Sequence, residues 1–240
     1  VGSSSDRSQR DDDEQESSNI VDRRGERGGG GGMRLPIGGG KLGIGGMLVV
    51  GVIALLLGQN PLAMIGMVEG AGVGGTGVGQ PQEAVAPSAP AALNGTHDRF
   101  IAKVLGSTER TWDAVFRDQL GKPYPQPKLN LFEGGVNSGC GQADSGMGPF
   151  YCPADQQVYL DASFFDDLSR RFGAPGDFAA AYVIAHEVGH HIQTVIGISA
   201  EVQKARRASG PAQGNALSVR QELQADCFAG VWAHHNRDLL

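Results

Sequence analysis

The sequence predicts an α+β fold in which a small β-sheet is followed by several helices. The nine Phe, four Tyr and two Trp residues all lie at or after Phe100, so the aromatic side chains that build a core are confined to the later part of the chain. There, short runs with strand propensity come first, and longer runs with an apolar period of three or four follow. Residues 96–240 are therefore expected to form the globular domain.

The charge of the chain excludes one class of partner. The formal net charge is −6, from 20 basic and 26 acidic side chains, and the basic ones form no stripe. Nucleic acid is therefore not an expected partner. Three cysteines are also too few for a disulfide-rich scaffold.

The first 95 residues divide into three parts. Residues 1–41 are polar and Gly-rich, which predicts a disordered tail. Residues 42–58 contain no charged or polar side chain and are expected to form a transmembrane helix that acts as a signal anchor. A cleaved signal peptide and a buried core helix are the alternatives. Residues 59–95, rich in Gly, Ala and Pro, are expected to form a flexible stalk.

The basic residues around the apolar segment predict its orientation. No Lys or Arg follows it before Arg99, and five flank it on the N-terminal side, Arg23, Arg24, Arg27, Arg34 and Lys41. Because basic flanks stay on the cytoplasmic side, the tail is expected in the cytoplasm and the globular domain outside it. The chain would then be a single-pass membrane protein, attached by one N-terminal helix.

The elements of the globular part follow from apolar spacing and from start and stop signals. Pro123 and Pro125 end the first amphipathic region, which holds one or two helices. Asp161 and Asp177 are candidate N-caps. The expected helices cover 97–120, 163–172, 177–195, 199–208 and 216–235, and the expected strands cover 128–132, 150–152 and 157–160.

Cys140 and Cys152 lie around short Gly-rich loops. If the domain lies outside the cytoplasm, a disulfide between them is expected. Two unpaired buried thiols are the alternative.

The segment His186-Glu187-Val188-Gly189-His190 lies within the expected helix over 177–195. Residues i and i+4 lie on one face of a helix, so both imidazoles can reach one ion. Glu187 is rotated by about 100° from His186 and flanks that ion, where a carboxylate can act on a metal-bound water. The motif therefore predicts a catalytic site for one zinc ion, with His186 and His190 as ligands and Glu187 as the general base.

A catalytic zinc needs a third protein ligand and one open position. The metzincin continuation is excluded, because Gln193 and Ile196 stand where it requires Gly and His. Glu222 is the leading candidate, and Asp226, one turn later on the same face, can accept the free N–H of a ligating imidazole. On spacing alone, Glu222 is equally well an ordinary solvated glutamate. Glu201 is a competing candidate, but it lies too near in sequence to the helix that carries His186 and His190.

Longer stretches around these residues add a resemblance. Ala185-His186-Glu187-Val188-Gly189-His190-His191, Glu222-Leu223-Gln224-Ala225-Asp226-Cys227, Ser138-Gly139-Cys140-Gly141 and Gly148-Pro149-Phe150-Tyr151-Cys152-Pro153 resemble the bacterial family named putative neutral zinc metallopeptidase. The two zinc motifs together are also similar to those of the gluzincins. The resemblance covers roughly residues 95–240. It implies a zincin-like fold, in which the sheet packs with the helix of the His-Glu-x-x-His motif and a further helix supplies the third zinc ligand.

These features together predict a membrane-anchored zinc peptidase, most simply an endopeptidase, that hydrolyses peptide or protein substrates with metal-activated water. The alternative is a non-catalytic, membrane-anchored envelope protein with a structural zinc site. A structural site would have four protein ligands, and the sequence offers no convincing fourth, which favours catalysis. His191, His234 and His235 are expected to have structural or solvated roles.

Overall fold

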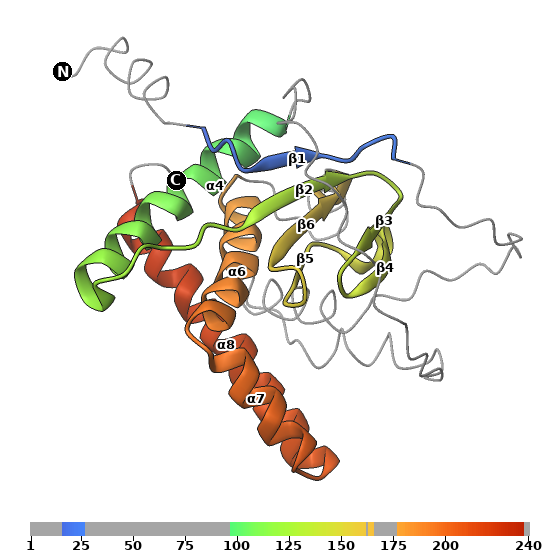
Figure 1. Ribbon diagram of the computed structural model, residues 1–240. Helices are drawn as coiled ribbons and strands as arrows, with labels where there is room; N and C mark the ends of the chain where they lie inside the picture. Colours follow the sequence, from blue (N-terminus) through green and yellow to red (C-terminus); the bar gives the residue numbers. More distant parts are fainter. Residues whose placement is uncertain (1–15, 27–96, 162, 166–176, 238–240) are drawn as a thin grey trace, which may run out of the picture.

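The computed structural model describes residues 16–26, 97–161, 163–165 and 177–237. These residues form a mixed α+β arrangement of one four-stranded sheet, one two-stranded sheet and packed helices (Figure 1), as the sequence predicts. The predicted transmembrane helix over 42–58 and the stalk over 59–95 lie outside the described residues. Within the part of the chain that is described, no helix combines the length and the apolar character that a membrane span requires.

The main sheet has the strand order β1-β2-β6-β5. Its strands β1, β2 and β6 are parallel, while β5 is antiparallel to β6. The strands are β1 (Ile20–Asp22), β2 (Lys128–Phe132), β5 (Phe150–Cys152) and β6 (Gln157–Asp161). A second, antiparallel pair consists of β3 (Gly135–Ser138) and β4 (Gly141–Asp144), and a disulfide joins Cys140 in its turn to Cys152 of β5.

Strand β1 corrects the prediction of a disordered tail over 1–41 for residues 16–26, and the rest of that predicted tail lies outside the described residues. Its register on β2 places Ile20 opposite Leu129, and the Ile20 side chain is only 3% exposed. Three strand residues between polar neighbours carry almost no local signal. Their ordering comes from pairing with a strand far along the chain, which a local reading of the sequence cannot detect. The folded unit therefore includes residues 16–26 as well as the region after residue 96.

Four of the predicted helices are present, while most of the one predicted over 163–172 lies outside the described residues. α6 (Asp177–Val195) has the predicted bounds, and α4 (Asp98–Val115) continues as a short π-helix over Phe116–Leu120. α7 (Ile198–Arg207) lies within a residue of its prediction. α8 (Pro211–His235) begins earlier than the predicted residue 216, because a proline in the first turn needs no N–H partner and has the helical φ already.

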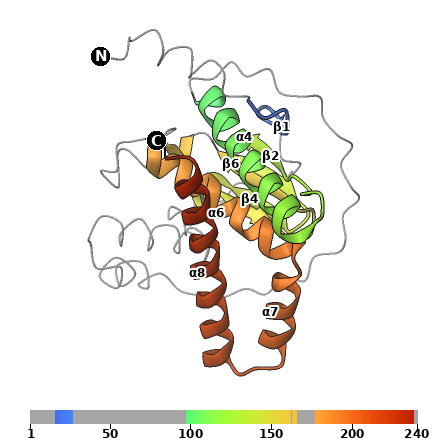
Figure 2. The ribbon, with the colours of Figure 1, turned by 90° about the vertical axis from the view of Figure 1, so that its left-hand side faces the viewer.

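The helices pack so that α6 lies between the sheet and α8. The apolar residues of α4 and α6 share one core with Leu129 and Leu131 of β2. Gly189 of α6 allows a close approach to α8, because a Cβ at this position would lie 2.8 Å from the carbonyl oxygen of Ala225. Figure 2 shows α7 and α8 as a helical hairpin that extends away from the sheet, and α8 packs against α6.

Candidate metal centre

Helix α6 presents His186 and His190 on one face. Their rings lie one turn apart, with centroids 4.8 Å from each other. Ile184 and Val188, on the opposite side of the same helix, are almost completely buried in the core, which fixes the rotation of α6 about its axis. The two imidazoles therefore face α8 because the opposite side of α6 is held by the core.

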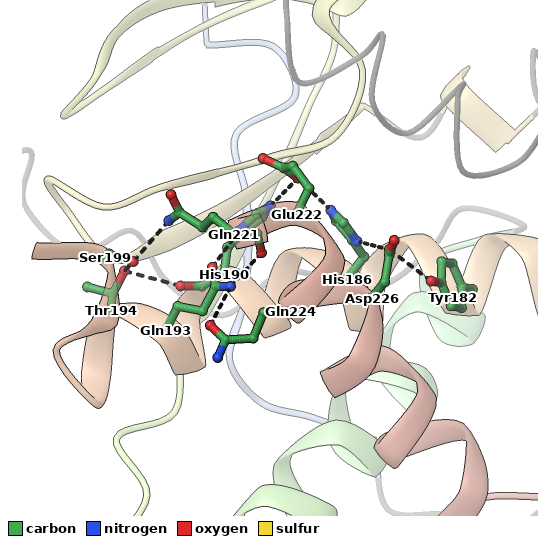
Figure 3. A network of polar contacts seen from close by, with 10 residues as sticks. All are labelled: Tyr182, His186, His190, Gln193, Thr194, Ser199, Gln221, Glu222, Gln224 and Asp226. Carbon is green, nitrogen blue, oxygen red and sulfur yellow. Dashed lines mark hydrogen bonds and ion pairs between the residues drawn. The ribbon is translucent and has the colours of Figure 1, made fainter. Parts of the chain in front are cut away.

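Helix α8 supplies a carboxylate between the two imidazoles. Glu222 Oε2 lies 3.4 Å from His186 Nε2 and 3.1 Å from His190 Nε2 (Figure 3). The three candidate ligand atoms all lie within 4.8 Å of one another. Zinc bonds to imidazole of about 2.0–2.1 Å in tetrahedral geometry require ligand atoms roughly 3.4 Å apart, so the set is of the right size and chemistry for zinc.

A second carboxylate on α8 orients one of the imidazoles. Asp226 Oδ1 lies 2.8 Å from His186 Nδ1 and also accepts a hydrogen bond of 2.9 Å from the hydroxyl of Tyr182. With Nδ1 occupied in this way, Nε2 of His186 is the nitrogen that faces Glu222. The structure thus separates the two carboxylates of α8: Glu222 lies between the histidines, and Asp226 lies behind one of them.

Even without a metal, the contacts within the cluster favour a charged imidazole and a charged carboxylate. Burial lowers the pKa of His186, but hydrogen bonds to Asp226 and Glu222 outweigh it and raise that pKa to about 10. Burial raises the pKa of Glu222, but hydrogen bonds from His186 and His190 outweigh it and hold that pKa at about 2. Without a metal, an imidazolium–carboxylate cluster therefore occupies the position of the ion.

Glu187 has a different environment from Glu222. Its side chain is 4% exposed and is not one of the three grouped ligands. Burial raises its pKa, an effect that the neighbouring histidines and a backbone hydrogen bond from Tyr151 partly offset. Glu187 and the three ligands line a cavity of about 210 Å³, which Phe150 and Tyr151 of β5 also line. A protonatable carboxylate thus lies beside the metal position without occupying it.

The other polar candidates lie outside the ligand cluster. His191 is buried and donates from Nε2 to the carbonyl oxygen of Pro125 at 2.6 Å, so its role is structural. Tyr159 donates to Asp155 at 2.7 Å, on the side of the smaller core cluster. His235 contacts the carbonyl oxygen of Val231 at the C-terminal end of α8.

Two residues at the site escaped the sequence analysis. Tyr182 donates to Asp226, and Gln193 contacts His190 Nδ1 through Oε1 at 3.0 Å. A signal for each exists in the helical period: Tyr182 lies four residues before His186, and Gln193 three residues after His190. Neither residue type is a metal ligand, so a search for ligands passes over both.

The comparison with known families agrees with this geometry. Residues 10–239 match the family described as "Putative neutral zinc metallopeptidase". The chain belongs to this family. The match begins before β1, so the family pattern includes the N-terminal strand as well as the candidate metal cluster. The family is described by a zinc metallopeptidase activity, and His186, His190 and Glu222 form a candidate metal site in this chain.

Two relatives show how far the similarity of this chain extends. The "Uncharacterized protein YpfJ" of Escherichia coli (strain K12) is 43% identical over 201 residues, which are 84% of this chain and 65% of the relative. The "Uncharacterized protein Rv2575" of Mycobacterium tuberculosis (strain ATCC 25618 / H37Rv) is 46% identical over 140 residues, which are 58% of this chain and 45% of the relative. The chain thus spans just under two thirds of the length of YpfJ. No solved structure matches the chain.

Proposed function

We propose that the protein is a zinc-dependent peptidase in which Glu187 is the general base. One observation carries the proposal. The side chains of His186, His190 and Glu222 converge as three candidate ligands. The carboxylate of Glu187 is buried beside them and is not part of this group. Three protein ligands with one open position are typical of catalytic zinc.

The chemistry follows from the environments of these residues. Zinc bound by the three ligands would lower the pKa of a water toward neutrality and polarise the scissile carbonyl group. Glu187 accepts the proton of the attacking water and returns it to the leaving amine. Because burial raises the pKa of Glu187, the carboxyl group is better matched to accepting and releasing a proton near neutral pH.

The sheet supports binding of an extended peptide. β5 is the outermost strand of the main sheet in the described residues, paired only with β6. Phe150 and Tyr151 of β5 also line the cavity that contains Glu187. A substrate segment that adds to this edge by backbone hydrogen bonds would cross the metal position, with chain continuing on both sides of the scissile bond. This arrangement favours an endopeptidase.

The alternative, a structural zinc site, is less well supported. A structural site uses four protein ligands. Within the described part of the chain, the ligand group contains only His186, His190 and Glu222, and the exposed Glu201 lies outside it on α7. Attachment of the peptidase to a membrane through residues 42–58 stays a prediction from the sequence.

Substitution of Glu187 tests the proposal. Glu187→Gln should keep stoichiometric zinc, because the side chain is not a ligand, yet lower peptide hydrolysis by several orders of magnitude. Glu201→Gln is a matched control for the loss of one negative charge on a neighbouring helix. Metal content and digestion of a peptide library by the full chain are the measurements. Near-normal turnover by the Glu187→Gln protein, with zinc bound, would contradict the mechanism.

A further inference from the structure

The two ligating histidines differ in what lies behind them. His186 is backed by the carboxylate of Asp226, whereas His190 is backed by the neutral amide of Gln193 (Figure 3). The Gln193 side chain is completely buried, although its type is usually found at the surface. A buried amide persists where its hydrogen bonds are satisfied.

The hydrogen bonds of Gln193 determine which way round its amide lies. Nε2 donates to the backbone carbonyl oxygen of Gln221 at 2.6 Å and to Oε1 of Gln224 at 3.0 Å. A carbonyl oxygen can only accept, so the nitrogen of the amide must face Gln221. Oε1 of Gln193 then faces His190, and an acceptor at that place requires a proton on His190 Nδ1.

This proton assignment has a consequence for the metal. With Nδ1 of His190 protonated, Nε2 is the nitrogen whose lone pair is available to an ion, and it lies 3.1 Å from Glu222 Oε2. The donor contact to Gln221 also ties α6 to the residue that directly precedes Glu222. One side chain therefore orients a ligand on α6 and restrains the neighbour of a ligand on α8.

We propose that Gln193 is a positioning residue for zinc, the neutral counterpart of Asp226. A neutral partner limits the negative charge of a site that already has the carboxylates of Glu187, Glu222 and Asp226. The proposal rests on the proposed function, because it assumes that the cluster binds zinc.

The experiment compares three variants of the full chain. Gln193→Met has a similar length but no acceptor for His190, and the zinc dissociation constant should rise roughly 10- to 100-fold. Gln193→Glu keeps an acceptor for His190 but loses both donors and adds a negative charge, so its affinity should lie between those of the Met variant and the wild type. Gln224→Met removes one partner of the Gln193 amide but leaves the His190 contact, and its affinity should stay near the wild-type value.

The readouts separate positioning from a purely structural role. Zinc affinity is measured by competition with a chelator, and the visible spectrum of the Co²⁺-substituted protein should shift in Gln193→Met but not in Gln224→Met. Equal affinities for Gln193→Met and wild type would overturn the inference, as would equal losses in Gln193→Met and Gln193→Glu. If the wild type itself binds no zinc, the proposed function fails instead.

Strand β1 carries a second, independent inference. The residues directly before and after β1 bond to the backbone of β2. Asn19 O accepts from Leu129 N–H at 2.9 Å, and Arg23 N–H donates to Leu131 O at 2.8 Å. Arg24 makes a two-point contact with Asp98, a residue of α4 that is 1% exposed, at 3.0 and 2.8 Å.

Further contacts bind residues 16–26 to the helix layer. Ser17 donates to Glu109 at 2.6 Å in a buried position, and Asn19 donates to the same carboxylate at 2.8 Å. Ser17 N–H also bonds to the carbonyl oxygen of Ala102 at 3.0 Å. Residues 16–26 thus pair with the sheet and also pack against α4.

We infer that residues 16–26 and 97–237 occupy one compartment as one folded unit. Residues 42–58 lie between them in the sequence. A single membrane crossing in that stretch would place β1 and β2 on opposite faces, where they could not pair. The predicted single-pass topology and this sheet therefore exclude each other.

Cysteine labelling of the full chain tests this inference. Cys227 is free and exposed on α8 and reports the metal-binding part. Ser18→Cys, at an exposed position beside β1, reports the N-terminal part in a Cys227→Ser background. A membrane-impermeant maleimide is applied to spheroplasts before and after lysis. Both cysteines should react at the same stage, and reaction of one before lysis and the other only afterwards would overturn the inference.

Discussion

Replacement of Gly189 by alanine should separate α6 from α8 at the metal cluster. The new Cβ would lie 2.8 Å from the carbonyl oxygen and 3.1 Å from the Cα of Ala225, and both are backbone atoms that cannot rotate away. Insertion of a methyl group into a packed contact costs about 1–3 kcal/mol. The gain in helix propensity from Gly to Ala, about 1 kcal/mol, opposes this cost.

Gly230→Ala provides the matched control, because a Cβ at Gly230 on α8 meets no atom within 4 Å. The difference between the two variants cancels the helix propensity and leaves the packing cost, so Gly189→Ala should be less stable than Gly230→Ala by about 1–3 kcal/mol. Urea unfolding of the metal-free proteins measures this difference. Zinc affinity should also fall in Gly189→Ala, since α8 carries the third ligand. Equal stability of the two variants, with unchanged zinc affinity, would refute the close approach of the helices.

The remaining predictions concern the ligands, the pH and the disulfide. Glu222→Ala should abolish stoichiometric zinc at micromolar protein, while Asp226→Ala should still bind zinc at saturating metal with roughly 10- to 100-fold lower affinity; the reverse order in metal titrations would exchange their roles. In the metal-free protein, the stabilising effect of His186 is complete below pH 6.5 and is lost as the pH rises through about 10. The stabilising effect of Glu222 is complete above pH 4.5 and is lost as the pH falls through about 2. Unfolding experiments should therefore find that the cluster adds most to the free energy of unfolding between pH 4.5 and 6.5. Cys140→Ser with Cys152→Ser should lower the unfolding free energy by about 2–3 kcal/mol, and an unchanged midpoint in denaturant would contradict this.

The parts of the fold that could be predicted are those with local, periodic signals. The bounds of α6 follow from Asp177 and from a long apolar pattern, and the helical period alone brings His186 and His190 together. The third ligand was harder to predict, since Glu222 is far from the first motif along the chain. Its assignment depends on α8 crossing α6 at Gly189, a contact between two helices that no local pattern specifies.

The parts that could not be predicted depend on contacts between distant residues. β3 and β4 are short and Gly-rich, and their turn around Gly139 is held by contacts such as the hydrogen bond of 2.6 Å to Asp155. Gln193 lies at helical spacing from His190, but its partners Gln221 and Gln224 are on another helix, and no local pattern specifies that contact. β1 has too few residues to show a strand period, and its partner lies after the long segment that precedes α4.

Strand β1 also decides how a shortened protein would behave. All three residues of β1 pair with one edge of β2, opposite Leu129, Asn130 and Leu131. A chain that begins at residue 96, the boundary that the composition suggests, would leave the backbone groups on that side of β2 without a neighbouring strand. An open edge of this kind, flanked by leucines that are fully buried in the folded chain, is a template for pairing with a second molecule. The shortened chain is therefore expected to self-associate through β2, and residues 16–26 protect the folded chain against aggregation.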